Sequence, residues 1–446
     1  MSCTRRKLLS STTVCLALLA APVCHAQSIA ITGTVLTPTG PVEHETILIR
    51  DGRIAAIGVQ IALPADLRRI DLGDAILAPG FIDLHNHMSF NVFPRWKPIT
   101  EFGARYDWQQ KPVYNVLITA PHQELVEQGL VCDAERYAEL KALAQGETST
   151  VGSDPACGSV NLTRKLDVDP GLPGAPTILY NVFPFQMTPE QRVAADKVLS
   201  AKPHGFLLIH VSEGAPHDAS AAREFTMLRQ QGFLRPGVNV IHGVAIPAEG
   251  FAEMAHAGVG WIWSPRSNIE LYGDTADVAA AHAAGVKMAL APDWSPTGSV
   301  GTLGELQYAS AWNRTQAPPP LTDRELVSMV TENPAAMVGL DAYLGALLPG
   351  HAADLVVLRR TASDVYEAMT HAAPQDVMLT VVRGLAVYGD PSLLRQWGVA
   401  ATDSVFVCGA TRAFASTMQY PSTVSKLAPA LQRMGRSLAP LTECGQ

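Results

Sequence analysis

Short apolar runs of strand length recur along the chain, and their spacing changes at two points. Near the start they follow one another closely, with turn signals at TG (39–40) and DG (51–52), which is typical of consecutive strands. After PG (79–80) a segment with helical periodicity follows each run, and after NP (333–334) strand patterns return. The closely spaced runs are 29–36, 45–51, 53–59, 353–358 and 380–388, and a helical pattern covers 422–437.

The middle stretch has the spacing of a parallel sheet. Its clearest apolar runs are 206–211, 238–244, 258–263 and 286–291. From His210 to His242 the spacing is 32 residues, and from Val259 to Val286 it is 27. Buried strands separated by helices at intervals of about 30 residues indicate βαβ units, and eight such units need roughly 250 residues. Residues 79–338 supply that length, so the sequence predicts an α/β fold with a TIM-type (β/α)8 barrel.

The first 26 residues have the composition of an export signal. Arg5, Arg6 and Lys7 precede a moderately apolar run at 8–23, and CHA (24–26) places small residues where a signal peptidase cuts. The run around the two arginines also resembles a twin-arginine signal, and an ordinary export signal is the equal alternative. We therefore expect an exported protein, located in the periplasm if the cell has an outer membrane.

Composition and charge narrow the class of partner. The chain has 47% hydrophobic and 17% charged residues, with 33 basic against 41 acidic side chains and a net charge of -8. Beyond Arg5, Arg6 and Lys7 of the expected signal it contains no cluster of Lys and Arg, so we do not expect a nucleic-acid partner. No apolar stretch reaches the roughly 18–20 residues of a membrane-spanning helix. The expected partner is a small-molecule substrate, and the sequence does not predict an oligomeric state.

Four cysteines follow the expected signal segment, and an exported protein can join them as disulfides. Four cysteines allow three pairings, which sequence alone does not distinguish. We favour pairing between nearest neighbours, Cys132 with Cys157 and Cys408 with Cys444. The alternative is four buried free thiols.

Histidines and an aspartate stand where predicted barrel strands end. His85 and His87 follow the first strand on alternate positions, so both project to the same side. His210, His242 and Asp293 end later strands, and the carboxyl ends of parallel strands face one mouth of a barrel. Imidazoles with a carboxylate bind zinc or a similar divalent ion. The alternative for each histidine taken alone is a hydrogen-bonded core residue.

Several short motifs over residues 28–390 resemble the amidohydrolase superfamily of metal-dependent hydrolases. They are PGFIDLHNH (79–87), HVSE (210–213), IHG (241–243), SPRSN (264–268), APDWS (291–295), TENPA (331–335) and LPGHAADLVV (348–357). The most similar branch is the cytosine and guanine deaminase group, which also contains S-adenosylhomocysteine deaminases and triazine hydrolases. The resemblance implies a barrel over 79–338 and a small composite β-sandwich from 27–78 and 339–390. An extension at 391–446 has no predicted role.

The resemblance also implies a ligand set for one ion. His85, His87, His210 and Asp293 correspond to the ligands of a single zinc, with another divalent ion such as Fe2+ as the alternative. Superfamily members with two metals usually bridge them with a modified lysine on the fourth strand. The predicted fourth strand, 177–183, contains no lysine, which favours one ion per chain.

Three residues correspond to the catalytic groups of the superfamily. Glu213 corresponds to the acid that carries a proton to a ring nitrogen, and His242 to the residue that polarises the attacking water. Asp293 can accept the proton of that water. These roles predict a hydrolase of carbon–nitrogen bonds other than peptide bonds, most simply a deaminase of a heterocyclic substrate. A hydrolase of cyclic or linear amides, with one or two metals, and an exported metal-binding protein without catalysis are the alternatives.

The segment after His87 departs from the purine-deaminase pattern, because residues 88–114 are rich in aromatic side chains. Such a segment can overhang the barrel mouth and stack on a flat substrate. We therefore expect Arg95, Trp96 and Trp294 to contact the substrate. The alternative is that the aromatic side chains of this segment pack it onto the barrel.

Overall fold

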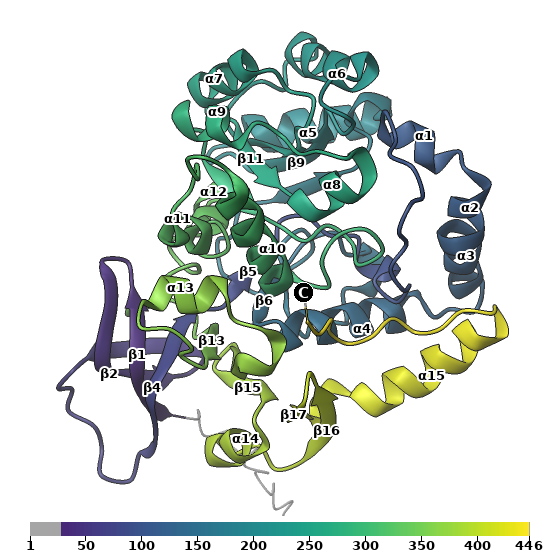
Figure 1. Ribbon diagram of the computed structural model, residues 1–446. Coiled ribbons are helices and arrows are strands. Elements are labelled where there is room, and N and C mark those ends of the chain that lie inside the picture. The colour runs from purple at the N-terminus through teal and green to yellow at the C-terminus, as the bar shows by residue number, and fades with distance from the viewer. Residues whose placement is uncertain (1–27, 446) are drawn as a thin grey trace, which may run out of the picture.

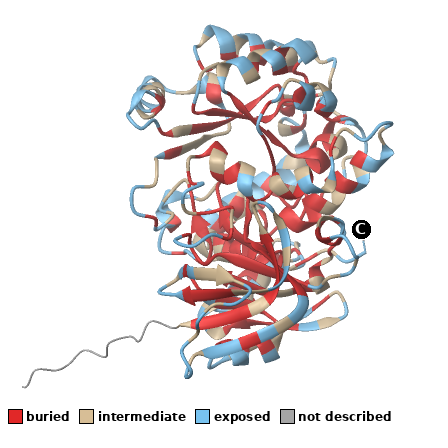
Figure 2. Cartoon of the chain, turned by 90° about the vertical axis from the view of Figure 1, so that its left-hand side faces the viewer, coloured by how far each residue is buried: buried red, intermediate tan, exposed pale blue. Residues whose placement is uncertain are grey.

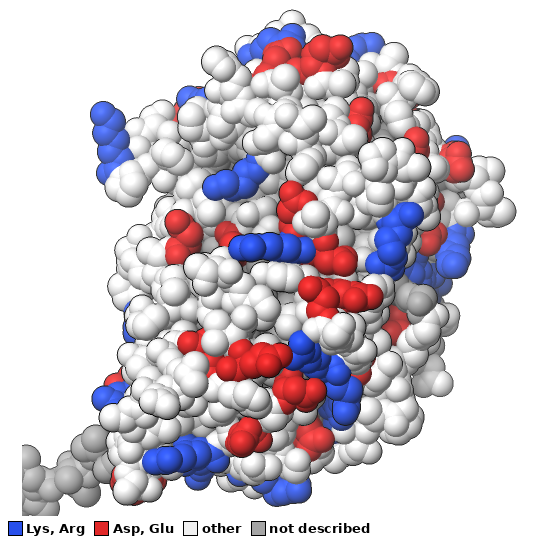
Figure 3. All heavy atoms as spheres, turned by 60° about the vertical axis from the view of Figure 1, so that its left-hand side comes forward, with Lys and Arg blue, Asp and Glu red and all other residues white. Residues whose placement is uncertain are grey.

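The computed structural model describes residues 28–445. It contains a central strand system with helices around it and a second strand system at the lower side of the view in Figure 1. The expected signal segment, residues 1–26, lies outside the described residues. Within the described part, no helix combines the length and apolar character needed to cross a membrane. On the face drawn in Figure 3, Lys and Arg lie among Asp and Glu and do not gather into one basic patch.

Eight short strands form the central system, and they follow one another in space as they do in the chain. They are β5 (Phe81–Ile82), β6 (Glu147–Thr150), β7 (Arg164–Lys165), β8 (Ile178–Asn181), β9 (Phe206–Val211), β10 (Val238–His242), β11 (Gly260–Trp263) and β12 (Met288–Leu290). All hydrogen-bonded neighbours among them are parallel. The α/β class with parallel strands in chain order is therefore confirmed.

The hydrogen bonding of these strands is interrupted at two places, so they form two sheets, of three and five strands, instead of the single closed ring that we expected. β5 and β7 have only two residues each, which is too short to complete a ladder on both sides. Backbone bonds from Asp293 N to His85 O (3.1 Å) and from Ile82 N to Val330 O (3.0 Å) still join the β5 segment to the chain that follows β12.

Helices cover the outside of the central strands, which are buried except for most of β8 (Figure 2). Their ends follow ordinary capping rules: α5, for example, begins after Thr188, whose hydroxyl accepts a bond from the Gln191 backbone in a capping box. The helices of this part are α1 (Arg105–Gln109), α2 (Pro112–Tyr114), α3 (Ala120–Glu127), α4 (Val131–Ala144), α5 (Pro189–Ser200), α6 (Ala219–Gln230), α7 (Ala248–Ala257), α8 (Pro265–Tyr272), α9 (Val278–Ala283), α10 (Thr302–Thr315), α11 (Asp323–Ser328) and α12 (Glu332–Met337).

Both ends of the chain build the second strand system, a nine-stranded sheet in the order β16-β17-β15-β14-β13-β4-β1-β2-β3. Its strands are β1 (Ile29–Thr37), β2 (Gly40–Arg50), β3 (Arg53–Gly58), β4 (Arg68–Pro79), β13 (Leu355–Leu358), β14 (Val377–Val382), β15 (Leu385–Gly389), β16 (Thr402–Val407) and β17 (Ala410–Ala415). β13 pairs with β4 and thereby joins the two ends of the chain. A separate two-layer sandwich is not confirmed, because the strands form one hydrogen-bonded sheet.

One strand prediction near the end of the chain was wrong in detail. The predicted strand 380–388 is a hairpin of β14 and β15, which turns at Arg383 and Gly384, both with positive φ. Apolar residues on both sides of this two-residue turn resemble one continuous strand in the sequence. Beyond residue 390, β16 and β17 continue the sheet.

The chain passes directly from the terminal sheet to the central strands through Gly80. β4 ends at Pro79, and β5 begins at Phe81. A Cβ atom at residue 80 would lie 2.2 Å from the side chain of Thr148, so only glycine fits between β4 and β5. This close packing places the β5 end, with its two histidines, at a defined position relative to both sheets.

The C-terminal segment covers the loop that follows β5. Helix α15 (Tyr420–Arg433) lies along α4 in Figure 1 and packs through Leu427 and Leu431 into the aromatic cluster of that loop. Ala439 N then donates to Val92 O at 2.8 Å. The remaining helices are α13 (Val365–Thr370) and α14 (Pro391–Trp397).

Disulfides join Cys132 to Cys157 and Cys408 to Cys444, which is the pairing favoured from the sequence. The second bridge ties the end of the chain to the turn between β16 and β17, and therefore anchors the segment that crosses the β5 loop.

Candidate active site

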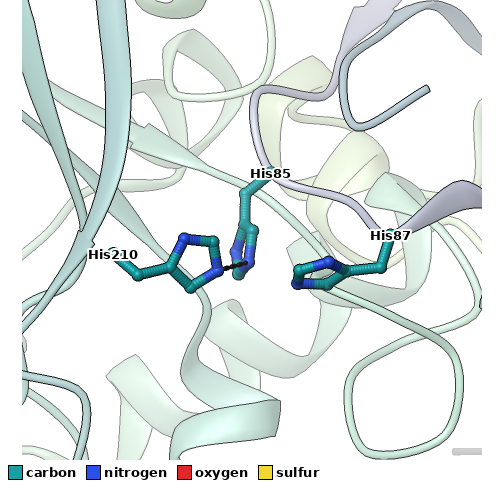
Figure 4. Close-up of side chains that lie close together, drawn as sticks. All are labelled: His85, His87 and His210. Carbon is teal, nitrogen blue, oxygen red and sulfur yellow. Dashed lines mark hydrogen bonds between the residues drawn. The ribbon is translucent and has the colours of Figure 1, made fainter. Parts of the chain in front are cut away.

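Four histidines and one aspartate meet at the carboxyl ends of the central strands. His85 and His87 follow β5, His210 lies in β9, His242 ends β10, and Asp293 follows β12. Figure 4 shows the rings of His85, His87 and His210 turned toward a common point, with a bond drawn between two of them. The Nε2 atoms of His85 and His210 are 3.1 Å apart. The five side chains predicted to converge therefore do so.

The backbone is strained where these residues sit. His242 and Asp293 adopt φ of 68° and 62°, and Ser212, beside the β9 histidine, adopts 55°. Left-handed conformations cost a non-glycine residue about 1–3 kcal/mol and concentrate at functional sites. The surrounding structure thus holds the strand ends in the turns that direct the side chains inward.

Asp83 orders the segment that carries the first two histidines. Its side chain is fully buried, and its two oxygens accept bonds from the His85 backbone (2.8 Å) and the Asn86 side chain (2.7 Å). Burial, and the nearby charge of Glu147, raise the pKa of Asp83.

Two serines that follow β11 orient one histidine and the aspartate of the cluster. Ser264 Oγ lies 2.8 Å from His85 Nδ1, and Ser267 Oγ donates to Asp293 Oδ2 at 2.6 Å. These bonds leave His85 Nε2 and Asp293 Oδ1 facing each other at 3.3 Å. Metal-binding side chains are commonly fixed in this way by an outer partner.

The residues present fit a divalent metal ion. Asp293 Oδ1 is buried, lies 3.3 and 3.4 Å from Nε2 of His85 and His87, and accepts no hydrogen bond from any described residue. Zinc bonds of about 2.0–2.2 Å in a tetrahedron place neighbouring ligand atoms roughly 3.3–3.6 Å apart, close to these distances. A cation would satisfy the buried carboxylate oxygen that the protein leaves without a donor.

The protonation of the histidines agrees with a ligand role. Burial lowers the pKa of His85 and His210 well below the ordinary value and that of His87 to about 4. The imidazoles are therefore neutral near neutral pH, which is the form that binds metals. Two further groups of side chains have ligand atoms close enough together to hold an ion: His85 with His242 and Asp293, and His210 with Glu213 and His242. Both groups overlap with the predicted ligand set.

Glu213 and His242 stand side by side next to the ligand cluster. Glu213 Oε2 is 3.6 Å from His242 Nε2, and both side chains are buried. Asn268 Oδ1 lies 2.9 Å from His242 Nδ1. Since a carbonyl oxygen only accepts, His242 donates from Nδ1, and its Nε2 lone pair faces Glu213 and the cluster. The pair can bind and pass protons beside the metal ligands.

Two buried side chains hold the Glu213 carboxylate from behind. Tyr272, at the end of α8, donates its hydroxyl to Oε1 at 2.7 Å, and Trp108 Nε1 donates to the Tyr272 oxygen at 2.9 Å. Arg105 lies 3.5 Å from Oε2 and 3.1 Å from Glu224. The carboxylate is therefore restrained on both oxygens.

A cavity of about 200 Å³ opens onto this cluster. It is lined by His87, Phe90, Trp108, Gln109, Tyr114, Val182, Phe183, His210, Glu213, His242, Asp293 and Trp294. Of the three residues expected to contact substrate, Trp294 is in the wall and the other two are not. The Arg95 guanidinium bonds to Glu270 (2.9 Å), and Trp96 is buried behind the wall against Trp108.

The fourth strand in order is β8, at the place predicted for it, and it contains no lysine. Lys165, in β7, is buried in an ion pair with Glu135 at 2.8 Å. The described ligand cluster therefore lacks the bridging lysine that two-metal sites usually have on the fourth strand.

Five residues that position the site carried no assigned role in the sequence. Arg105, Ser264, Ser267, Asn268 and Tyr272 contact Glu213, His242 or the ligands. For those between 264 and 268, a signal was present, because they directly follow a predicted barrel strand. The sequence around Arg105 and Tyr272 contains no such signal, because Glu213, which both contact, is distant in sequence.

Comparison with known proteins decides the family. Residues 120–388 match the family described as the Amidohydrolase family. The chain belongs to this family. The match includes the β9, β10 and β12 residues of the site and begins after the two β5 histidines.

Curated relatives of the chain are deaminases by name. The 5-methylthioadenosine/S-adenosylhomocysteine deaminase of Syntrophobacter fumaroxidans is 24% identical over 427 residues, covering 83% of this chain and 94% of the relative. The 5'-deoxyadenosine deaminase of Methanosarcina mazei is 22% identical over 392 residues, covering 79% and 89%. This chain, like its family, is a hydrolase.

Solved structures with the same fold include metal-containing hydrolases. Atrazine chlorohydrolase from Arthrobacter aurescens TC1, complexed with zinc, has a TM-score of 0.65 at 20% identity and covers 80% of this chain and 95% of its own. Guanine deaminase of E. coli has a TM-score of 0.64 at 18% identity, covering 81% and 99%. At these identities the likeness establishes the fold.

Proposed function

We propose that the protein hydrolyses a carbon–nitrogen bond other than a peptide bond, releasing ammonia or an amine from a heterocyclic substrate. One observation carries this proposal: Glu213 lies restrained beside a histidine and aspartate cluster in the wall of an aromatic cavity. A proton-carrying acid at that position suits a reaction in which a ring nitrogen or an amino group must be protonated.

The ligands would be His85, His87, His210 and Asp293, and the ion one zinc per chain, with Fe2+ as the alternative. A bound divalent ion of this kind makes hydroxide available near neutral pH by lowering the pKa of water to about 7. Imidazole nitrogens and a carboxylate oxygen are donor types that zinc binds in proteins.

The side chains around the ion would transfer the protons and stabilise the addition intermediate. Water adds to the ring carbon that bears the amino group, and Asp293 takes one proton from that water. Glu213 takes the second proton of the water and delivers it to the adjacent ring nitrogen, and the proton held by Asp293 passes to the amino group as the carbon–nitrogen bond breaks. Ammonia leaves and the ring retains the oxygen, so atoms and charge balance. His242 Nε2 stabilises the oxygen of the addition intermediate when it carries a proton.

A hydrolase of cyclic or linear amides is the second candidate, and it would use the same ligands. The lysine-free fourth strand argues against its two-metal form. A metal-binding protein without catalysis is disfavoured because such a protein has no use for a restrained carboxylate beside an accessible cavity.

The test compares the wild-type holoenzyme with Glu213→Gln. Glutamine keeps the shape but cannot donate a proton near neutral pH, so kcat should fall by about 10²–10⁴ while metal content stays near one ion per chain. Glu325→Gln, at a partly exposed position on α11, is the matched control and should leave both values unchanged. A Glu213→Gln protein with wild-type ammonia release contradicts the proposal, and loss of metal would instead make Glu213 a ligand.

We also propose that residues 1–26 direct export and are removed, so that the mature protein works in the periplasm of a cell with an outer membrane. Their basic start and apolar middle support this. Amino-terminal sequencing of protein from its native host tests it, and a soluble cytoplasmic chain starting near Met1 would contradict it.

A further inference from the structure

The wall of the cavity beside Glu213 restricts the substrate further. We infer that the substrate is a compact, uncharged heterocycle with at most small apolar substituents, and that it carries no sugar and no charged tail. This inference rests on the proposed function and names its substrate class. It differs from the nucleoside compounds after which the curated relatives are named.

Among the described residues, five aromatic side chains besides the histidines line the cavity. Phe90, Trp108 and Tyr114 come from the loop after β5, Phe183 follows β8, and Trp294 follows β12. Ring centroids of Trp108 and Tyr114 are 5.0 Å apart, and Trp294 lies 5.9 Å from both Trp108 and Phe90. Aromatic faces at these spacings form a continuous apolar surface, which favours flat rings and alkyl groups.

Both indole N–H groups of the wall are bonded to side chains that lie outside it. The indole of Trp108 donates to Tyr272, and that of Trp294 donates to Thr297. Outside the catalytic cluster, the Tyr114 hydroxyl and the Gln109 amide are the remaining polar side-chain groups among the described lining residues. A sugar has several hydroxyls, and burying them without partners costs about 1–3 kcal/mol each.

The cationic side chains near the cavity are neutralised by protein carboxylates. No Lys or Arg is among the described residues that line the cavity. Arg95 pairs with Glu270 at 2.9 Å, Arg266 pairs with Glu443 at 2.7 Å, and Arg105 is held behind the catalytic carboxylate. A carboxylate or phosphate on the substrate would therefore find no cation to bind.

The size of the cavity also favours a compact substrate. Its volume of about 200 Å³ is below the roughly 300–1,000 Å³ typical of sites for drug-sized ligands. A single substituted ring fills such a space, whereas a nucleoside with a further tail would extend beyond the aromatic wall.

The experiment measures kcat/KM of the metal-loaded enzyme on matched pairs, each a free base and its riboside: cytosine and cytidine, adenine and adenosine, guanine and guanosine. An alkylamino-triazine is added as a ring with apolar substituents. We expect the highest kcat/KM on a sugarless ring, at least tenfold above that of any riboside. A riboside that equals or exceeds its base overturns the inference but leaves the proposed function standing.

If no compound on this panel releases ammonia or an amine, the result contradicts the proposed function. The inference about the substrate class is then tested by ligand binding alone. Quenching of tryptophan fluorescence in the holoenzyme reports occupancy, because Trp108 and Trp294 line the cavity. Tighter binding of a sugarless ring than of its riboside supports the inference. Tighter binding of ribosides, or no binding of any ring, overturns it.

A variant tests the aromatic wall itself. Phe183 is 36% exposed at the rim, so Phe183→Ala should fold normally, and KM for the best sugarless ring should rise roughly 5- to 150-fold through lost stacking. Phe406→Ala, at a 77% exposed position in β16, is the control and should leave KM unchanged. An unchanged KM in Phe183→Ala contradicts the inference.

Discussion

The hydroxyl of Tyr272 is expected to position the proton-carrying carboxylate, and Tyr272→Phe removes only that hydroxyl. Tyr272 donates to Glu213 Oε1 at 2.7 Å and accepts from Trp108 Nε1 at 2.9 Å. Burial, followed by the charge of Glu213, raises the pKa of Tyr272 well above its usual value. The phenol is therefore a neutral donor throughout the working pH range of the enzyme.

The size of the effect follows from the geometry. A hydrogen bond to a charged group contributes about 1.5–3 kcal/mol, and each 1.36 kcal/mol of transition-state stabilisation is tenfold in rate. If the bond acts by holding Glu213 in place, kcat should fall about 10- to 150-fold, with little change in KM. Arg105, 3.5 Å from the other oxygen, continues to restrain the carboxylate, which keeps the loss below that of Glu213→Gln.

The assay combines steady-state kinetics with elemental analysis and thermal unfolding of the metal-loaded protein. Tyr137→Phe is the matched control, because the Tyr137 hydroxyl is also buried and donates at 2.7 Å, but to Ala439 O, away from Glu213. Both variants should lose some stability, and only Tyr272→Phe should lose kcat. Wild-type kcat in Tyr272→Phe, or an equal loss of kcat in the control, would refute the reasoning.

Three further predictions concern the metal and the cross-links. His85→Ala combined with His87→Ala should abolish stoichiometric metal binding, and unchanged metal content by elemental analysis would show that the ligands are wrong. Ser267→Ala removes the 2.6 Å bond to the carboxylate that follows β12, so metal affinity in a chelator competition should fall about 10- to 100-fold, and an unchanged affinity would contradict an orienting role. The Cys132–Cys157 disulfide spans 25 residues, and replacing both cysteines by serine should lower the free energy of unfolding by about 3.5 kcal/mol in denaturant titrations, whereas identical midpoints would contradict a stabilising cross-link.

The parts of the site predicted from the sequence are those that depend on strand ends. His210, His242 and Asp293 each follow an apolar run of strand length, and parallel strands bring their carboxyl ends to one side. The predicted run 206–211 coincides with β9, and the bounds of the runs for β10, β11 and β12 lie within two residues of the observed ones. The local hydrophobic pattern, together with the rule that parallel strands end on one side, was sufficient to predict these site residues.

The parts that were missed depend on contacts between distant segments. Arg95 and Trp96 lie in an aromatic loop whose composition suggested a pocket, but composition does not show which face of a loop points inward. The structure turns the Arg95 guanidinium to Glu270 and buries Trp96, and it sets other aromatic residues of the same loop in the wall. The extension after residue 390 similarly showed no role until α15 was seen to cover that loop.

The sequence by itself determined the α/β class, the family, and the side chains that gather at the strand ends, because strand periodicity and short motifs are properties of neighbouring residues. Only the tertiary structure decided how Glu213 is held, since Tyr272 and Arg105 reach it from α8 and α1. It also decided which aromatic side chains face the cavity, because that depends on how the β5 loop packs beneath the C-terminal helix. Hydrogen bonds and packing between segments far apart in the chain have no local signature, and it is these contacts that shape the pocket around the predicted ligands.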